Sequence, residues 1–246
     1  MFDAEDLIKQ AIERHKPNIY VAFSGGKCSE VVLHLALKYW PQIPVMFNNT
    51  GVEIPETLDF IKLIRKQWNL NFIETKPEKT YWQCVEQYGF PEFKSSRKKK
   101  EGKTKTPMCC YHLKEVPFRK MIKKHGFTAI FTGIREEESW NRRLNAIKMS
   151  NKGYHDGIKM CGQRYYAKKE NVWKYHPITL WTHQQVWDYI KKNNLPYNKA
   201  YNYKTVERTG CMPCTAYMGW QEQLREINPK LYEMIQAKKG QTLLVS

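Results

Sequence analysis

The stretch that decides the fold is Ile19-Tyr20-Val21-Ala22-Phe23, followed at once by Ser24-Gly25-Gly26-Lys27-Cys28-Ser29. Its first half is a short apolar run of the kind that forms a buried parallel strand. A largely apolar helical pattern then covers residues 30–39, and a second apolar run covers residues 43–47. The order of strand, tight turn, helix and strand predicts a βαβ unit.

The same alternation continues along the chain. Pro55 suits the first turn of a further helix, and residues 71–75 and 129–133 fit further strands. Thr182 is placed to cap a helix over residues 183–193. We therefore predict an α/β fold with an open, mostly parallel, doubly wound sheet and helices on both faces, in which ligands bind at the carboxyl ends of the strands.

Three other segments are interpreted from their composition. Residues 94–106 are mostly lysine and arginine, which predicts a mobile loop that either contacts nucleic acid or is only solvated. Residues 151–171 contain three glycines without clear periodicity and are a candidate lid. Residues 220–237 have the pattern of one last amphipathic helix.

Length and charge limit the classes of function. A chain of 246 residues can bury a sizeable core as one domain. The formal net charge of +17 favours a polyanionic partner or a highly charged substrate. The alternative is a basic surface whose only effect is to keep the protein soluble by repulsion between molecules. There is no run of about 20 apolar residues and no signal-peptide pattern, so we expect a cytoplasmic protein without a membrane partner.

The turn at residues 24–29 has the composition of an anion site. Its glycines let the backbone approach a ligand closely, and the following helix directs N–H groups and its positive end toward phosphate or sulfate. The turn lacks the spacing of a Walker loop, and an ordinary tight turn is the alternative interpretation.

Four of the seven cysteines lie in two tight pairs, Cys109-Cys110 and Cys211-Met212-Pro213-Cys214. Two such pairs brought together by folding provide four thiolates for zinc or for an iron-sulfur cluster. Adjacent side chains point in different directions, so Cys109 and Cys110 suit the separate irons of a cluster better than one zinc ion. Four unligated buried thiols are the remaining alternative.

Several motifs occur in a fixed order. They are the turn at residues 24–29, Asn49-Thr50-Gly51, Pro55-Glu56-Thr57, Cys109-Cys110 with Lys114, Thr132-Gly133-Ile134-Arg135 with Glu138, Ser139 and Arg142, Pro177-Ile178, Trp181, Val186-Trp187, Tyr189-Ile190, and Cys211 with Cys214. In these motifs the chain resembles the phosphoadenosine phosphosulfate (PAPS) reductase family of the adenine-nucleotide α-hydrolase (PP-loop) superfamily, in its cluster-bearing branch. The resemblance covers about residues 20–214.

The resemblance implies a Rossmann-like PP-loop fold with an adenine nucleotide across the strand ends, either ATP or a sulfonucleotide (PAPS or adenosine phosphosulfate, APS). It implies that a 4Fe-4S cluster is held by Cys109, Cys110, Cys211 and Cys214, with Lys114 beside it. The residues expected to bind the nucleotide or its phosphate are Ser24, Gly25, Gly26, Lys27, Ser29, Asn49, Thr50, Gly51, Gly133, Arg135 and Arg142. Ion pairing with the glutamates at 136–138 is the alternative role of the two arginines.

The same resemblance suggests a division of the chain. Residues 1–205 would form the adenine-nucleotide-binding domain, and residues 206–246 a cysteine-bearing segment and helix packed on it, in one structural domain overall.

Three departures from the family pattern bear on the reaction. Family reductases attack with the cysteine of a C-terminal Glu-Cys-Gly-Leu-His segment, which residues 240–246 do not contain. Members that use ATP usually have Asp where Cys28 stands, and the common Asp-Thr-Gly is Asn49-Thr50-Gly51 here. Two carboxylates that would face magnesium are therefore missing.

The candidate catalytic residues are Cys28, Lys27 and Cys161. A thiol at a helix N-terminus beside Lys27 is expected to be partly thiolate, so Cys28 is a candidate sulfur carrier, with simple filling of space as the alternative. Cys161 in the candidate lid is a candidate resolving or attacking thiol. Cys84 is interpreted as packing.

Three functions fit these observations. The first is ATP-dependent sulfur transfer to a nucleic acid (tRNA or DNA), with Mg as a candidate companion of ATP. The second is reduction of PAPS or APS to sulfite with thiols, and the third is a non-catalytic nucleotide- or redox-sensing module. A sulfur donor or thiol reductant protein is a candidate partner in the first two, and oligomer formation is open. The sequence alone favours the first.

Overall fold

The computed structural model describes residues 2–92 and 107–244, so the basic run at residues 94–106 lies outside the described residues. The helical elements are α1 (Ala4–His15), α2 (Lys27–Tyr39), α3 (Pro55–Gln67), α4 (Tyr81–Tyr88), α6 (Met108–Cys110), the π-helical η1 (Tyr111–Glu115), α7 (Val116–His125), the 3-10 turn η2 (Glu136–Glu138), α8 (Trp140–Ser150), α9 (His183–Lys192), the 3-10 turn η3 (Lys199–Asn202), α10 (Trp220–Ile227) and α11 (Pro229–Leu244). The strands are β1 (Ile19–Ala22), β2 (Val45–Asn48), β3 (Phe72–Thr75), β4 (Ala129–Phe131), β5 (Tyr154–His155), β6 (Ile158–Lys159), β7 (Arg164–Ala167) and β8 (Val172–Tyr175).

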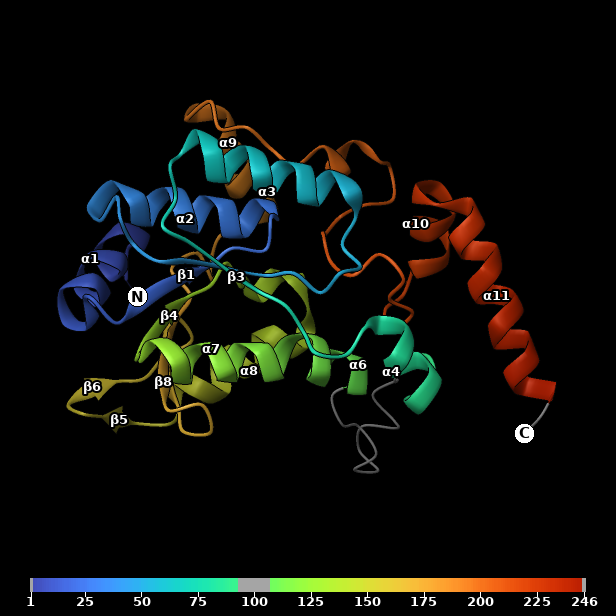
Figure 1. Ribbon diagram of the computed structural model, residues 1–246. Coiled ribbons are helices and arrows are strands. Elements are labelled where there is room, and N and C mark those ends of the chain that lie inside the picture. Colours follow the sequence, from blue (N-terminus) through green and yellow to red (C-terminus); the bar gives the residue numbers. More distant parts are fainter. Residues whose placement is uncertain (1, 93–106, 245–246) are drawn as a thin grey trace. The chain divides into compact units, whose positions relative to one another are not determined.

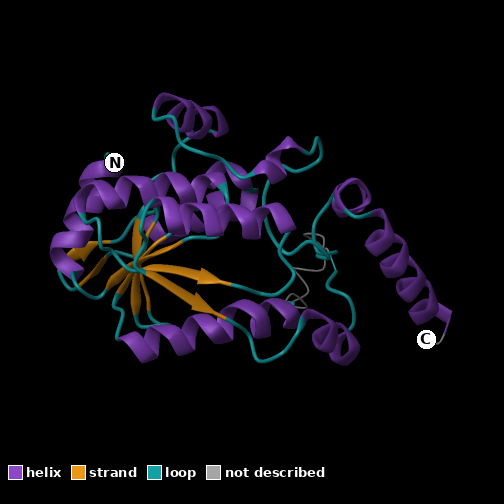
Figure 2. Ribbon diagram, turned by 45° about the horizontal axis from the view of Figure 1, so that its top comes forward, coloured by secondary structure: helices purple, strands orange, loops and turns teal. Residues whose placement is uncertain are grey.

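The predicted α/β fold is confirmed. Six strands form a sheet in the order β3-β2-β1-β4-β8-β7. Strand β1 pairs in parallel with β2 and β4, β4 pairs in parallel with β8, and only the edge strand β7 is shown to run antiparallel to its neighbour. Figure 1 shows α1 and α2 over one face of this sheet and α7 over the other, and Figure 2 shows the same sheet between helical layers.

The helix starts follow from local sequence. Asp3 caps α1 by accepting hydrogen bonds from the N–H groups of Glu5 and Asp6. Thr182 caps α9 as predicted, and it forms a reciprocal capping box with Gln185. Each such cap stabilises its helix by about 1 kcal/mol.

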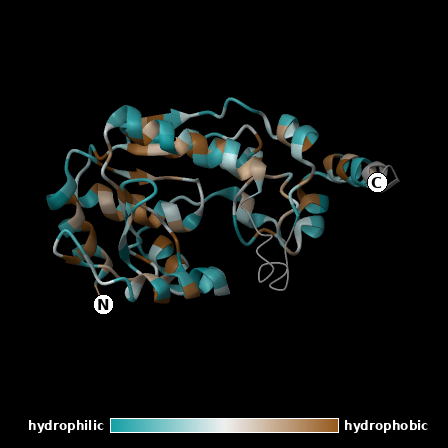
Figure 3. Ribbon diagram, turned by 90° about the horizontal axis from the view of Figure 1, so that it is seen from below, coloured by the Kyte–Doolittle hydropathy of each residue, from teal (hydrophilic) through white to brown (hydrophobic). Residues whose placement is uncertain are grey.

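Each helix buries one face. In α1 the buried side chains include Leu7, Ile8 and Ile12, spaced as one stripe of an amphipathic helix. Figure 3 shows hydrophobic and hydrophilic residues alternating along the helices in this way. Burying one such side chain stabilises the fold by about 1.5–3 kcal/mol, and this apolar packing fixes the strand ends that bear the site.

By their internal contacts, the residues form two compact units. The first unit comprises Met1–Phe47, Asp59–Glu74 and Arg119–Asn198, and the second comprises Asn48–Leu58, Thr75–Phe118 and Lys199–Ser246. The predicted boundary at residue 205 stays a prediction. The turn at residues 24–29 belongs to the first unit, and the four paired cysteines belong to the second.

The candidate lid at residues 151–171 is not the irregular loop that was expected. It contains the antiparallel pair β5–β6 and the edge strand β7, which pairs with β8 from Arg164↔Tyr175 to Ala167↔Val172. Aromatic residues at Tyr165, Tyr166 and Trp173 favour paired strands over loop, and the glycines mark the turns between them.

The single C-terminal helix that was expected is two helices. Asn228 ends α10, and its Oδ1 accepts a hydrogen bond of 3.0 Å from the N–H of Leu231. Pro229 is the first residue of α11, where a missing N–H costs nothing, whereas it would break a continuous helix. None of the helices described has the length and apolar character needed to cross a membrane.

Candidate functional site

The turn after β1 is built for close approach of a ligand to backbone. Gly25 has φ of 72°, in the left-handed region. The Ser29 hydroxyl donates to the carbonyl of Gly26 at 2.8 Å and lies 3.1 Å from the Ser24 hydroxyl. No side chain among the described residues caps α2 at Gly26, so the start of this helix keeps the character of an anion site.

Asn198 supports this turn and was missed by sequence reasoning. It is completely buried, and its Nδ2 donates to the carbonyl oxygen of Gly25 at 2.9 Å. A single asparagine more than 170 residues away in sequence has no spacing pattern that would reveal the contact.

The loop after β4 lies directly against the start of α2. A Cβ atom on Gly133 would lie 2.5 Å from the carbonyl carbon of Cys28 and 2.6 Å from the N atom of Ser29. Only a glycine fits this contact, and it keeps the loop after β4 beside the anion-binding turn.

We expect Gly133→Ala to weaken both the fold and anion binding at the turn, because the added methyl group meets backbone. Overpacking of this kind costs roughly 1–3 kcal/mol. The free energy of unfolding in urea and the dissociation constant for AMP measure the two effects. Gly210→Ala is the matched control, since a Cβ there meets nothing within 4 Å. Equal effects of the two variants would contradict the role of this contact.

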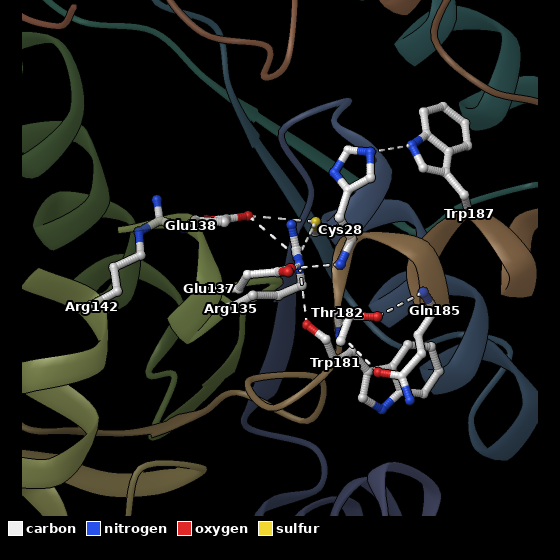
Figure 4. A network of polar contacts seen from close by, with 10 residues as sticks. Cys28, Arg135, Glu137, Glu138, Arg142, Trp181, Thr182, Gln185 and Trp187 are labelled. Atoms are coloured by element: carbon white, nitrogen blue, oxygen red, sulfur yellow. Dashed lines mark hydrogen bonds and ion pairs between the residues drawn. The ribbon is translucent and has the colours of Figure 1, made fainter. Parts of the chain in front are cut away.

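A polar network surrounds the Cys28 thiol, as Figure 4 shows. The Nε–H of Arg135 donates to Cys28 Sγ at 3.2 Å, and the thiol itself donates to Glu138 Oε1 at 3.5 Å. Arg135 is only 3% exposed and also pairs with Glu137. Arg142 pairs with the other oxygen of Glu138. Both predicted anion-binding arginines are thus engaged with glutamates, and their role toward a ligand stays a prediction.

Lys27, the first residue of α2, is 4% exposed. Its ammonium group lies over the Trp187 ring, 5.7 Å from the centroid. A cation–π contact of this kind holds the lysine at the start of α2. The role of Lys27 toward phosphate stays a prediction.

The predicted nucleotide residues Asn49, Thr50 and Gly51 form a separate turn in the second unit. The carboxylate of Glu53 accepts from the N–H groups of Thr50 and Gly51 at 2.9 and 3.1 Å and from the Thr50 hydroxyl at 2.6 Å. The Thr50 hydroxyl also lies 3.6 Å from Cys211 Sγ. Glu53 was not predicted, because one glutamate two residues after a Thr-Gly pair has no signal of its own.

The structure brings the four paired cysteines into one neighbourhood. Cys211 and Cys214 lie on one turn, in which the N–H of Cys214 donates to the carbonyl oxygen of Cys211. The N–H of Met212, between them, donates to the carbonyl oxygen of Val52 at 2.7 Å. The hydroxyl of Tyr81 donates to the carbonyl of Pro213 at 2.6 Å. Burial and, after it, the charges of all four thiols raise the pKa of Tyr81.

Lys114 interacts electrostatically with three of these thiols. The Cys211 thiol, with Cys110 and Cys214, raises the pKa of the Lys114 ammonium. The hydrogen bond from the Cys109 thiol, with the charge of Lys114, lowers the pKa of Cys110 to about 6. A lysine beside several thiolates neutralises part of their charge.

The four paired cysteines are thiolate donors, which suit zinc or an iron-sulfur cluster. Among the described residues, no three His, Cys, Asp or Glu side chains converge closely enough to hold one metal ion. A 4Fe-4S cluster needs its four thiolates farther apart, one on each iron. The cluster on the four cysteines, with Lys114 beside it, stays a prediction.

The other two cysteine predictions have different settings. Cys84 is 1% exposed and packs with Tyr81 and Leu113, as a packing residue should. Cys161 is half-buried, and its N–H donates to the carbonyl of Arg164 at 2.7 Å in an isolated β-bridge. Its catalytic role stays a prediction.

The sequence from residue 18 to residue 217 matches the phosphoadenosine phosphosulfate reductase domain. The chain belongs to this family. Members with this domain are mostly enzymes, and the match covers both the turn at residues 24–29 and all four paired cysteines.

Two proteins of known sequence are similar to this chain along most of its length. An adenosine 5'-phosphosulfate reductase of Geobacillus kaustophilus is 28% identical over 87% of this chain and 79% of its own length. An uncharacterized protein of Methanocaldococcus jannaschii is 32% identical over 94% of this chain but only 43% of its own length. The chain therefore spans less than half of that larger relative.

Solved structures share the fold. The PAPS reductase of Candida auris in its phosphate complex has a TM-score of 0.58 at 18% identity, over 84% of this chain and 88% of that one. The U34-tRNA thiolase NcsA of Methanococcus maripaludis, with its 4Fe-4S cluster, has a TM-score of 0.50 at 13% identity, over 98% and 77% of the two chains. At these identities the likeness shows a common fold.

Proposed function

We propose that the protein reduces an adenylyl sulfate, APS or PAPS, to sulfite with electrons from a thiol. The adenine nucleotide would bind at the turn of residues 24–29, with its phosphate or sulfate at the start of α2. The G. kaustophilus reductase, similar along most of both chains, supports this reaction class.

The observation that carries the proposal is that glutamates near the turn are paired with arginines. Glu137 pairs with Arg135, and Glu138 pairs with Arg142 and lies 3.7 Å from Arg135 Nε. A thiol, Cys28, stands at the second position of α2. Carboxylates that are neutralised by arginines are poor ligands for Mg²⁺, whereas an adenylyl sulfate needs no metal to react with a thiol.

The second unit would contribute the iron-sulfur centre. Cys109, Cys110, Cys211 and Cys214 would hold a 4Fe-4S cluster, with Lys114 balancing their charge. Such a cluster supplies redox capacity and a fixed charge.

A direct test uses protein purified without oxygen, radiosulfur-labelled APS or PAPS, and a thiol reductant. We expect labelled sulfite and free AMP (or its 3'-phosphorylated form), and no cleavage of ATP. Release of AMP and pyrophosphate from ATP, without sulfite from either sulfonucleotide, would overturn the proposal. Binding of nucleotide without any turnover would identify a sensing module instead.

ATP-dependent sulfur transfer to a nucleic acid is the second candidate. The net charge of +17 favours it, since a polyanion would bind such a chain. The arginine-bound glutamates beside Cys28 are the reason for placing it second, although the sequence alone ranks it first. Binding to tRNA or DNA that falls steeply with salt, together with cleavage of ATP, would restore it to first place.

A further inference from the structure

We propose that Cys28 is a nucleophile at the anion-binding turn, with Glu138 as the acceptor of its proton and Arg135 as the cation that holds its thiolate. The proposal rests on the proposed function for the identity of the group attacked. The pairing of the three side chains stands on geometry alone.

The first step of the argument is the pair of hydrogen bonds at sulfur. The Cys28 thiol donates to Glu138 Oε1 at 3.5 Å and accepts from Arg135 Nε at 3.2 Å. A nucleophile within hydrogen-bond reach of a base, which is itself oriented by a third group, is the general arrangement of nucleophilic catalysis. Here the third group is Arg142, which pairs with the other oxygen of Glu138.

Arg135 is held with its Nε directed at the thiol. Its Nη1 donates to Glu137 and to the carbonyl oxygen of Trp181. Glu137 is in turn fixed by the backbone N–H of His183, which donates to its Oε2 at 2.6 Å at the start of α9. Figure 4 shows this chain of contacts from Arg135 to α9. A fixed guanidinium stabilises a thiolate without reorganising.

The position of Cys28 suits attack on a bound anion. It is the second residue of α2, directly after the Gly25-Gly26 turn. The contact between Gly133 and the Cys28 backbone keeps the loop that leads to Arg135 and Glu138 in place. A residue that only filled space would need neither polar contact.

The reaction step balances as follows. Cys28 Sγ forms a bond to the sulfur of the adenylyl sulfate, the bond from that sulfur to the phosphate oxygen breaks, and the electron pair leaves with the AMP moiety. The thiol proton passes to Glu138, and the SO₃ group stays on Cys28 as an S-sulfonate. A thiol then attacks Sγ, releases sulfite and leaves a mixed disulfide, which a second thiol reduces to regenerate Cys28.

One experiment tests the thiol without any substrate. Iodoacetamide labelling at pH 7, followed by mass spectrometry of the peptides, compares Cys28 with Cys161. We expect Cys28 to react about tenfold faster although it is the more buried of the two, and Arg135→Lys to remove that advantage. Cys28 reacting no faster than Cys161 would overturn the proposal, whether or not the protein reduces a sulfonucleotide.

A second experiment follows the adduct. With labelled APS and no reductant, wild type should carry the label on the Cys28 peptide, and Cys28→Ser should carry none while still binding AMP. Glu138→Gln should lose activity about a hundredfold near pH 7 and recover it at alkaline pH, where solvent takes the proton. Sulfite release by Cys28→Ser at the wild-type rate would overturn the nucleophile and leave the proposed function intact.

Discussion

Between about pH 4.5 and pH 8 the free energy of unfolding of wild type is expected to fall by roughly 4–5 kcal/mol because of Glu30, and Glu30→Gln is expected to abolish this fall. Glu30 on α2 is completely buried, and neither carboxylate oxygen has a hydrogen-bond partner among the described residues. Burial raises the pKa of Glu30 from 4.5 to about 8. The folded protein therefore keeps a proton that the unfolded chain releases over this interval.

The sign of the effect follows from that proton. Below pH 4.5 Glu30 is protonated in both the folded and the unfolded state, so it does not make stability depend on pH. Above pH 4.5 the free energy of unfolding falls as pH rises, until the carboxyl of the folded protein also ionises near pH 8. Urea unfolding at pH 5 and pH 8 measures the difference for wild type and for Glu30→Gln. Glu13→Gln, at an exposed position of α1, is the control. Equal pH slopes in wild type and Glu30→Gln would show that Glu30 has a partner in solution.

Cys211→Ser is expected to remove nearly all protein-bound iron. Cys211 lies beside Thr50 and raises the pKa of Lys114, so it belongs to the neighbourhood of the four thiols. Loss of one thiolate from a four-thiolate site leaves one iron without its protein ligand and the Lys114 charge less balanced. Iron and sulfide analysis of protein purified without oxygen, with absorbance near 400 nm, measures the loss.

Cys161→Ser is the matched control for that loss, because Cys161 is a half-buried thiol of the other unit. It should keep the iron content of wild type. If wild type itself contains zinc and no sulfide, or if Cys211→Ser keeps its iron, the cluster assignment is wrong.

The parallel strands were predictable because buried strands are nearly continuous apolar runs with turn residues at their ends. Residues 19–23 and 129–133 have that form, and both are strands of the sheet at β1 and β4. Strand β8 was missed, since Lys174 interrupts its apolar pattern. Lys174 pairs with Glu170 at 3.7 Å, which allows a charge within a largely buried strand.

The residues of the candidate site could be predicted where they lie close together in sequence in a recognisable pattern, and not elsewhere. The Gly-Gly turn and the two cysteine pairs have such a pattern. The contacts of Asn198 with Gly25 and of Glu53 with Thr50 are made by single polar side chains to backbone or hydroxyl groups. The partners of Arg135 depend on how η2 and the start of α9 fold, and no periodic pattern in the sequence predicts these contacts.

The route of the chain between its two units limits how the molecule can be dissected genetically. The chain passes from one unit to the other after Phe47, Leu58, Glu74, Phe118 and Asn198. No uninterrupted gene fragment therefore contains all of either unit without also containing segments of the other. Testing the anion-binding turn separately from the four cysteines requires point substitutions in the full chain, not truncation.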